Sequence, residues 1–124
     1  MLRSSRLLPH GLFLAGVLCL ASSLIWAHAI IVESRPGIND VITGPILEIK
    51  LRFNVRIDGT RSKLTLILPD GTSRPVDLPQ QVSPDSISAT VPQIVPGSYH
   101  LHWQVLAGDG HITQGDIPFS VATQ

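Results

Sequence analysis

Short runs in which apolar and polar residues alternate recur along the chain after residue 29, with turn residues between them. In Ile46–Phe53 an apolar side chain falls on every second position, and charged residues fill most of the positions between. Tyr99–Val105 repeats the pattern, with aromatic and aliphatic residues on one face and His100, His102 and Gln104 on the other. A period of two residues predicts β-strands that bury one face.

Seven runs of this kind predict seven short strands, and no helical period competes with them. The predicted strands are Ile30–Glu33, Ile46–Phe53, Leu64–Leu68, Arg74–Leu78, Ser86–Val91, Tyr99–Val105 and Ile117–Val121. Pro69–Thr72 has the composition of a hairpin turn. These spacings predict an all-β fold, a Greek-key β-sandwich of immunoglobulin-like type. We expect Phe53, Tyr99, Trp103 and Phe119 to supply the large core side chains.

The first 27 residues have a different pattern. Arg3 and Arg6 precede an apolar stretch from Gly11 to Leu20, which is followed by small residues at 21–23 and by the short run Leu24-Ile25-Trp26-Ala27. This order is typical of a cleaved secretory signal peptide. The apolar centre is about half of the ~20 residues that span a bilayer, so a retained anchor is the less favoured alternative. We expect this signal segment to be removed and the rest of the chain to be exported as one domain.

Signal rules alone leave the cleavage position open. Cleavage after Ala27 makes His28 the first residue of the exported chain. Cleavage after Ala29 uses the better small-x-small pattern, Ala27-His28-Ala29, and removes the histidine.

Composition narrows the chemistry that the exported domain can perform. The chain has nine Lys and Arg and nine Asp and Glu, without a run of like charge, so nucleic acid and anionic membranes are not expected partners. Its only cysteine, Cys19, and its only methionine, Met1, both lie in the predicted signal peptide. The exported domain therefore has no disulfide and no sulfur ligand.

Two separate features supply nitrogen and oxygen donors. A chain that begins at His28 offers its α-amine and its imidazole Nδ1. The turn Asp109-Gly110-His111 adds a second imidazole and a carboxylate. Three nitrogens and one oxygen form a donor set that suits Cu(II). Taken alone, Asp-Gly-His is ordinary turn composition and only a weak sign of metal binding.

His100 and His102 are two residues apart and share one face of a predicted strand, so they could chelate one ion. The alternation of that strand also explains them as exposed side chains on a polar sheet surface. We favour the second interpretation.

Together these motifs resemble the CopC family of periplasmic copper-resistance proteins. The resemblance rests on His28-Ala29, Leu51-Arg52-Phe53, Tyr99-x-Leu101-x-Trp103-x-Val105-x-x-x-Asp109-Gly110-His111, and Gly115-x-x-x-Phe119-x-Val121. It implies cleavage after Ala27 and a Greek-key barrel or sandwich related to cupredoxins. It also implies one Cu(II) ion per chain, bound by the amine and imidazole of His28 and by Asp109 and His111. A copper carrier or scavenger with a CopD-type inner-membrane partner, and not an enzyme, is the expected function.

The sequence departs from the family pattern in three places. Asn54-Val55-Arg56 follows Phe53, where many members have an acidic residue near the copper. The exported domain has no methionine-rich Cu(I) site, and Ile112 replaces the usual proline after Asp-Gly-His. Transfer of copper between two oxidation-state sites in one molecule is therefore not expected.

Two other functions stay open at this point. A copper ion held by an N-terminal histidine is also the centre of lytic polysaccharide monooxygenases, which need an open copper position and exposed aromatic residues. If cleavage falls after Ala29, a metal-free immunoglobulin-like assembly module becomes the expectation.

Overall fold

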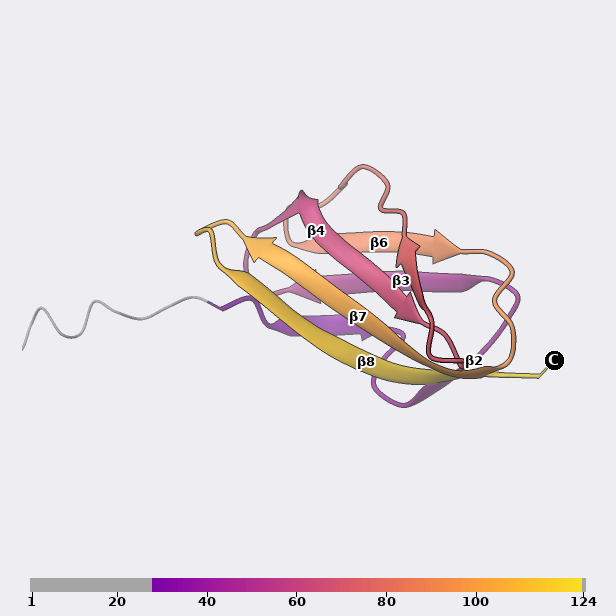
Figure 1. The fold of residues 1–124 in the computed structure, drawn as a ribbon. Coiled ribbons are helices and arrows are strands. Elements are labelled where there is room, and N and C mark those ends of the chain that lie inside the picture. Colours follow the sequence, from indigo (N-terminus) through magenta and orange to yellow (C-terminus); the bar gives the residue numbers. More distant parts are fainter. Residues whose placement is uncertain (1–27, 124) are drawn as a thin grey trace, which may run out of the picture.

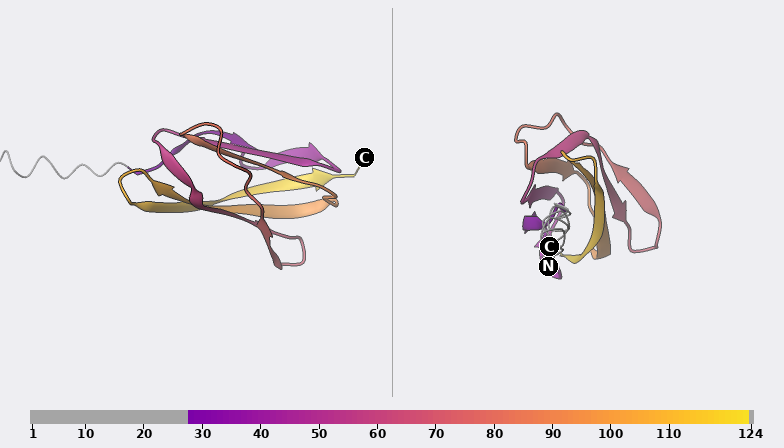
Figure 2. Two further views of the ribbon diagram at one scale, coloured as in Figure 1. Left: turned by 90° about the horizontal axis from the view of Figure 1, so that it is seen from above. Right: turned by 90° about the vertical axis from the view of Figure 1, so that its left-hand side faces the viewer.

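The computed structural model describes residues 28–123, which form two β-sheets packed face to face (Figure 1). The smaller sheet has the strand order β1-β3-β6 and the larger one the order β2-β8-β7-β4-β5. The smaller sheet contains β1 (Ile31–Arg35), β3 (Leu47–Phe53) and β6 (Ser86–Val91); the larger contains β2 (Asp40–Thr43), β4 (Ile57–Ile67), β5 (Ser73–Val76), β7 (Gly97–Ala107) and β8 (Ile112–Ala122). Figure 2 shows the two layers from the side. The predicted all-β sandwich is confirmed, and the predicted signal peptide, residues 1–27, lies outside the described residues.

The core lies between the sheets and follows the alternation of the strands. Every second side chain of β3 is buried, and so is every second side chain from Tyr99 to Ala107 in β7. The rings of Phe53 and Trp103 meet edge to face, and those of Tyr99 and Phe119 stack, each pair with centroids 5.4 Å apart. All four predicted aromatic core residues are buried. They bridge the two sheets and neighbouring strands, so they stabilise the fold and are not available at its surface.

The described residues contain eight strands, one more than the sequence predicted. The additional strand is β2, which pairs in parallel with β8 after the chain crosses from the smaller to the larger sheet. Asn39 and Asp40 have the composition of a turn, and the strand has only four residues. Its pairing partner lies at the far end of the sequence, so no local pattern revealed it.

Three strands of the larger sheet, β4, β7 and β8, are also longer than predicted. β4 begins at Ile57 instead of Leu64, because the turn-like residues Asp58, Gly59 and Thr60 form an irregularity within the strand. β7 continues to Ala107 and β8 begins at Ile112, so a tight turn joins the two strands. The predicted hairpin at residues 69–72 is confirmed between β4 and β5.

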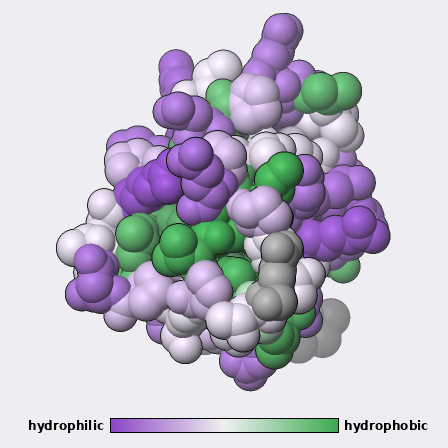
Figure 3. Space-filling model, turned by 90° about the vertical axis from the view of Figure 1, so that its right-hand side faces the viewer, coloured by the Kyte–Doolittle hydropathy of each residue, from purple (hydrophilic) through white to green (hydrophobic). Residues whose placement is uncertain are grey.

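The two ends of the sandwich differ in chemistry. At the end where β7 begins and β8 finishes, apolar side chains are exposed around a shallow hollow (Figure 3). The hollow is lined by Gly44, Pro45, Ile94, Pro96, Val121 and Ala122. None of these residues can titrate or supply an imidazole or a carboxylate. The candidate metal ligands lie at the opposite end.

Candidate metal centre

The turn between β7 and β8 carries two of the predicted ligands. The N–H of Ala107 donates to the carbonyl of His111 at 2.8 Å, and the N–H of Gly110 donates to the carbonyl of Ala107 at 2.9 Å. Gly110 has a φ of +90°, a left-handed conformation that glycine adopts without strain. The sequence Asp-Gly-His therefore makes a closed turn that carries both candidate ligand side chains.

Asp109 and His111 contact each other within this turn. One carboxylate oxygen of Asp109, Oδ1, accepts a hydrogen bond from the backbone N–H of His111 at 3.1 Å. The other, Oδ2, lies 3.0 Å from the ring nitrogen Nδ1 of His111. Each side chain is a little over one third exposed. The carboxylate thus lies against the His111 ring at Nδ1, and both side chains remain partly exposed.

This arrangement favours the charged form of Asp109. The backbone hydrogen bond from His111 is the largest influence and lowers the pKa of the Asp109 carboxyl; burial opposes it, and the nearby His111 side chain lowers this pKa further. The carboxylate is therefore ready to act as an oxygen donor or as the partner that orients the imidazole.

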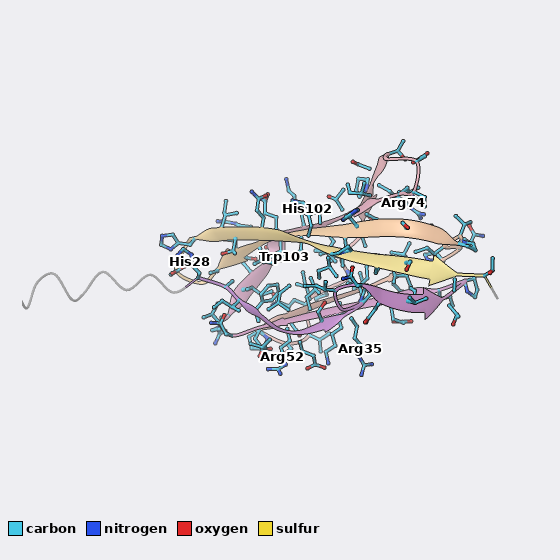
Figure 4. All side chains as sticks on the ribbon, turned by 90° about the horizontal axis from the view of Figure 1, so that it is seen from below. His28, Arg35, Arg52, Arg74, His102 and Trp103 are labelled. Carbon is cyan, nitrogen blue, oxygen red and sulfur yellow. The ribbon has the colours of Figure 1, made fainter. Side chains whose placement is uncertain are left out.

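The N-terminal segment reaches the same end of the sandwich. His28 is exposed there, near the turn between β7 and β8 (Figure 4). Ala29 is only 3% exposed and belongs to the hydrophobic core. Ile30 is held by Asn54: its N–H donates to Asn54 Oδ1 at 2.7 Å, and its carbonyl accepts the N–H of Asn54 at 3.0 Å. His28 therefore extends from an anchored segment.

The loop between β3 and β4 connects this segment to the β7–β8 turn. Asn54 forms hydrogen bonds with Ile30 in the N-terminal segment. Two residues later, the carbonyl of Arg56 accepts a hydrogen bond from the N–H of Gly108 in the turn, at 3.0 Å. Residues 54–56 thus contact both parts of the chain that carry the predicted ligands. Sequence reasoning noted residues 54–56 only as a place where an acidic residue is missing, and did not foresee this anchoring role.

The described residues bring His28, Asp109 and His111 to one end but do not close them into a cluster. Within residues 28–123, no group of three or more His, Cys, Asp or Glu side chains is placed to hold a metal ion. In the full chain the backbone nitrogen of His28 is a peptide amide bonded to Ala27. The amine that the predicted site requires exists only after cleavage.

His100 and His102 lie elsewhere, on the outer face of β7. Their neighbours Tyr99, Leu101 and Trp103 are buried on the other face, as the alternation predicted. His102 contacts Asp116 of β8, its Nδ1 lying 3.0 Å from Asp116 Oδ1. This cross-strand partner depends on strand register and was not predicted.

The family model described as the CopC domain matches residues 31–122. The chain belongs to the CopC family. Copper resistance protein C of Xanthomonas campestris pv. juglandis is 33% identical over 110 residues, which cover 82% of this chain and 86% of that protein. Protein YobA of Escherichia coli K12 is 28% identical over 105 residues, 82% of this chain and 85% of that protein.

Solved structures of CopC proteins have the same fold. The crystal structure of CopC from Methylosinus trichosporium OB3b matches with a TM-score of 0.68 at 25% identity, covering 78% of this chain and 96% of that one. PcoC from Escherichia coli, described as a methionine-rich copper resistance protein, matches with a TM-score of 0.59 at 24% identity over 77% of this chain and 100% of that one. This CopC chain has no methionine after Met1. Across residues 28–123, no helix is long and apolar enough to cross a membrane.

Proposed function

We propose that this CopC chain is exported to the periplasm, is cleaved after Ala27 and binds one Cu(II) ion through His28, Asp109 and His111. The ion is cargo: the protein lowers the concentration of free copper and carries it, with a CopD-type inner-membrane transporter as the acceptor. The observation that carries the proposal is the pair of contacts made by residues 54–56, which hold the N-terminal segment and the β7–β8 turn at one end of the sandwich.

The packing of the N-terminal segment supports cleavage after Ala27. A domain that began at Ile30 would lose Ala29, whose side chain is buried in the core. Cleavage after Ala27 keeps this residue and leaves only the exposed His28 ahead of it. The new α-amine then stands next to the His28 imidazole on a segment that Asn54 anchors.

The available donors suit Cu(II) better than Cu(I). The amine, two imidazoles and one carboxylate are nitrogen and oxygen ligands, which Cu(II) accepts in a tetragonal arrangement. Cu(I) favours thiolate and thioether sulfur, and residues 28–124 contain neither cysteine nor methionine. The charged Asp109 also offsets part of the charge of a divalent ion.

A binding protein also fits the surface better than a polysaccharide monooxygenase. Residues 28–124 contain four aromatic residues, Phe53, Tyr99, Trp103 and Phe119. Each is at most 8% exposed. An aromatic platform for a polysaccharide therefore has no side chains to build it in this domain.

Cu(II) electron paramagnetic resonance on protein purified with its native terminus tests the proposal. We expect one tightly bound ion per chain, a signal coupled to nitrogen, and a mass that begins at His28. A mass that begins at Ile30, or a native chain that takes up no Cu(II), contradicts it. An Asp109→Ala variant separates the two roles of the carboxylate, because only the loss of a direct ligand changes the g values strongly.

A further inference from the structure

The outer face of the larger sheet carries a second group of imidazoles, away from the proposed copper centre. His100 and His102 are two positions apart on β7, so both point out of the sandwich while Leu101 between them is buried. Figure 4 shows His102 on the outer side of the sheet and Trp103 between the sheets. Residues spaced in this way are about 6.6 Å apart along a strand, which lets two imidazoles reach one ion.

Asp116 prepares one of these rings for metal binding. It stands directly opposite His102 on β8, and its Oδ1 lies 3.0 Å from His102 Nδ1. With Nδ1–H donating to the carboxylate, the lone pair of the neutral ring is on Nε2 and faces outward. A histidine that binds a metal commonly has a carboxylate on its other nitrogen, which orients the ring and makes it more basic.

The surroundings of His100 leave its ring accessible. Its cross-strand neighbours are Ile67 on β4 and Pro118 on β8, neither of which has a polar side chain. Within residues 28–123, no side-chain hydrogen bond or ion pair involves the His100 ring. The charged groups on this part of the face are Asp116 and Lys63, and Lys63 is opposite Gln104 rather than a histidine.

We propose that His100 and His102 form a second, weaker site for one Cu(II) ion, with Asp116 as the residue that orients His102. Two imidazoles bind the ion directly and water completes the coordination, consistent with the lack of any three-residue cluster in the described part of the chain. Imidazole accepts several divalent ions, and Cu(II) binds most tightly among those of the first transition row. The site lies five residues before the end of β7, about 16 Å along the strand from the β7–β8 turn, so one ion cannot serve both centres.

The second site can be tested without the first. In the chain that begins at residue 28, His28→Ala together with His111→Ala leaves His100 and His102 as the only histidines. We expect this double variant to bind one Cu(II) ion per chain in a competition titration, with nitrogen coupling in the electron paramagnetic resonance spectrum. The ion should broaden the nuclear magnetic resonance signals of both rings.

Three further substitutions in that double variant identify the ligands. His100→Ala should abolish the bound ion, and Asp116→Asn should weaken it about 10–100-fold, the range for residues that orient a ligand. Gln104→Ala changes the same face without removing an imidazole and should leave the affinity unchanged. Copper uptake that is equal with and without His100, or an absence of uptake in large copper excess, overturns the proposal. Neither result depends on the centre at His28 and His111.

Discussion

Asn54 and Ile30 form a closed pair of hydrogen bonds at the start of the domain. The side-chain oxygen of Asn54 accepts the N–H of Ile30 at 2.7 Å, and the N–H of Asn54 donates to the Ile30 carbonyl at 3.0 Å. The pair continues the β1–β3 ladder beyond Ile31 and Phe53. It therefore restricts the direction in which the two residues ahead of Ile30 leave the sandwich.

Asn54→Ala should weaken Cu(II) binding, because it releases the segment that carries His28. We expect the Cu(II) affinity to fall about tenfold, which is the lower end of the range for substitutions of residues that position a metal ligand. The free energy of unfolding of the metal-free protein should fall by about 1 kcal/mol for the lost hydrogen bond. Asn54→Asp, which keeps the accepting oxygen, should restore most of the affinity.

Thr72→Ala is the control for Asn54→Ala. It removes a hydrogen bond to Asp70 in the β4–β5 hairpin, at 2.6 Å, far from the proposed centre. It should lower stability slightly and leave the Cu(II) affinity unchanged. An equal affinity loss in both variants would show that Asn54 acts through general stability and not through the position of His28.

One residue added before His28 should reduce Cu(II) affinity by orders of magnitude. Retention of Ala27 changes the His28 α-amine into a peptide amide, which no longer offers a lone pair at neutral pH. The fold should be unaffected, because His28 is exposed and the core begins at Ala29. A chain extended by one residue at the C-terminus is the matched control. Competition titration of both chains measures the effect, and equal affinities would exclude the amine as a ligand.

The sequence predicted the features that depend on local pattern. Alternation in Ile46–Phe53 and Tyr99–Val105 identified the buried faces, because a strand with one buried face must alternate. The strand β2 escaped prediction because its parallel pairing with β8 gives it a stability that its own four residues do not indicate.

The same distinction between local and long-range contacts applies to the side chains of the candidate sites. Asp109 and His111 are close in sequence, and their turn could be identified from composition. The hydrogen bond that Ile30 donates to Asn54 and the contact of His102 with Asp116 join residues that are far apart in the sequence. Both contacts depend on the register of the sheets, which a single sequence does not reveal. The sequence therefore indicates only that Asn54-Val55-Arg56 lacks the acidic residue of the family pattern, and not that Asn54 holds the N-terminal segment.

Gly115→Ala should destabilise the domain. Gly115 faces Trp103 across the β7–β8 ladder, and a Cβ atom at residue 115 would lie 2.8 Å from Cζ2 of the indole. Because Trp103 packs against Phe53, the ring cannot shift without disturbing the core. We expect a loss of about 1–3 kcal/mol in the free energy of unfolding, measured by urea denaturation.

Gly108→Ala is the control for this substitution. A Cβ atom there would be 3.7 Å from the carbonyl oxygen of Arg56, an ordinary contact distance. Its unfolding free energy should stay within about 0.5 kcal/mol of the parent value. If Gly115→Ala is equally neutral, the close approach of Gly115 to the indole does not constrain the fold.

Asp109 should contribute to the acid dependence of stability only at low pH. Its pKa in the folded protein is lowered, chiefly by the backbone hydrogen bond from His111, so folding favours the charged form. Its contribution is fully present above about pH 4, the ordinary pKa of an aspartate, and is lost as pH falls through the lower value in the folded state. Unfolding of metal-free protein by urea at several pH values should show this loss, and Asp109→Asn should remove it.

The same shift predicts how Asp109 affects copper release on mild acidification. Between about pH 7 and about pH 5 the carboxylate stays ionised, because its pKa lies below the ordinary value near 4. The ratio of Cu(II) affinities between the parent and Asp109→Asn should therefore be constant over this interval, while both affinities fall as protons compete for the nitrogen donors. Competition titrations at each pH measure the ratio. A ratio that shrinks towards one by about pH 5 would mean that Asp109 gains its proton early, which its hydrogen bond from His111 should prevent.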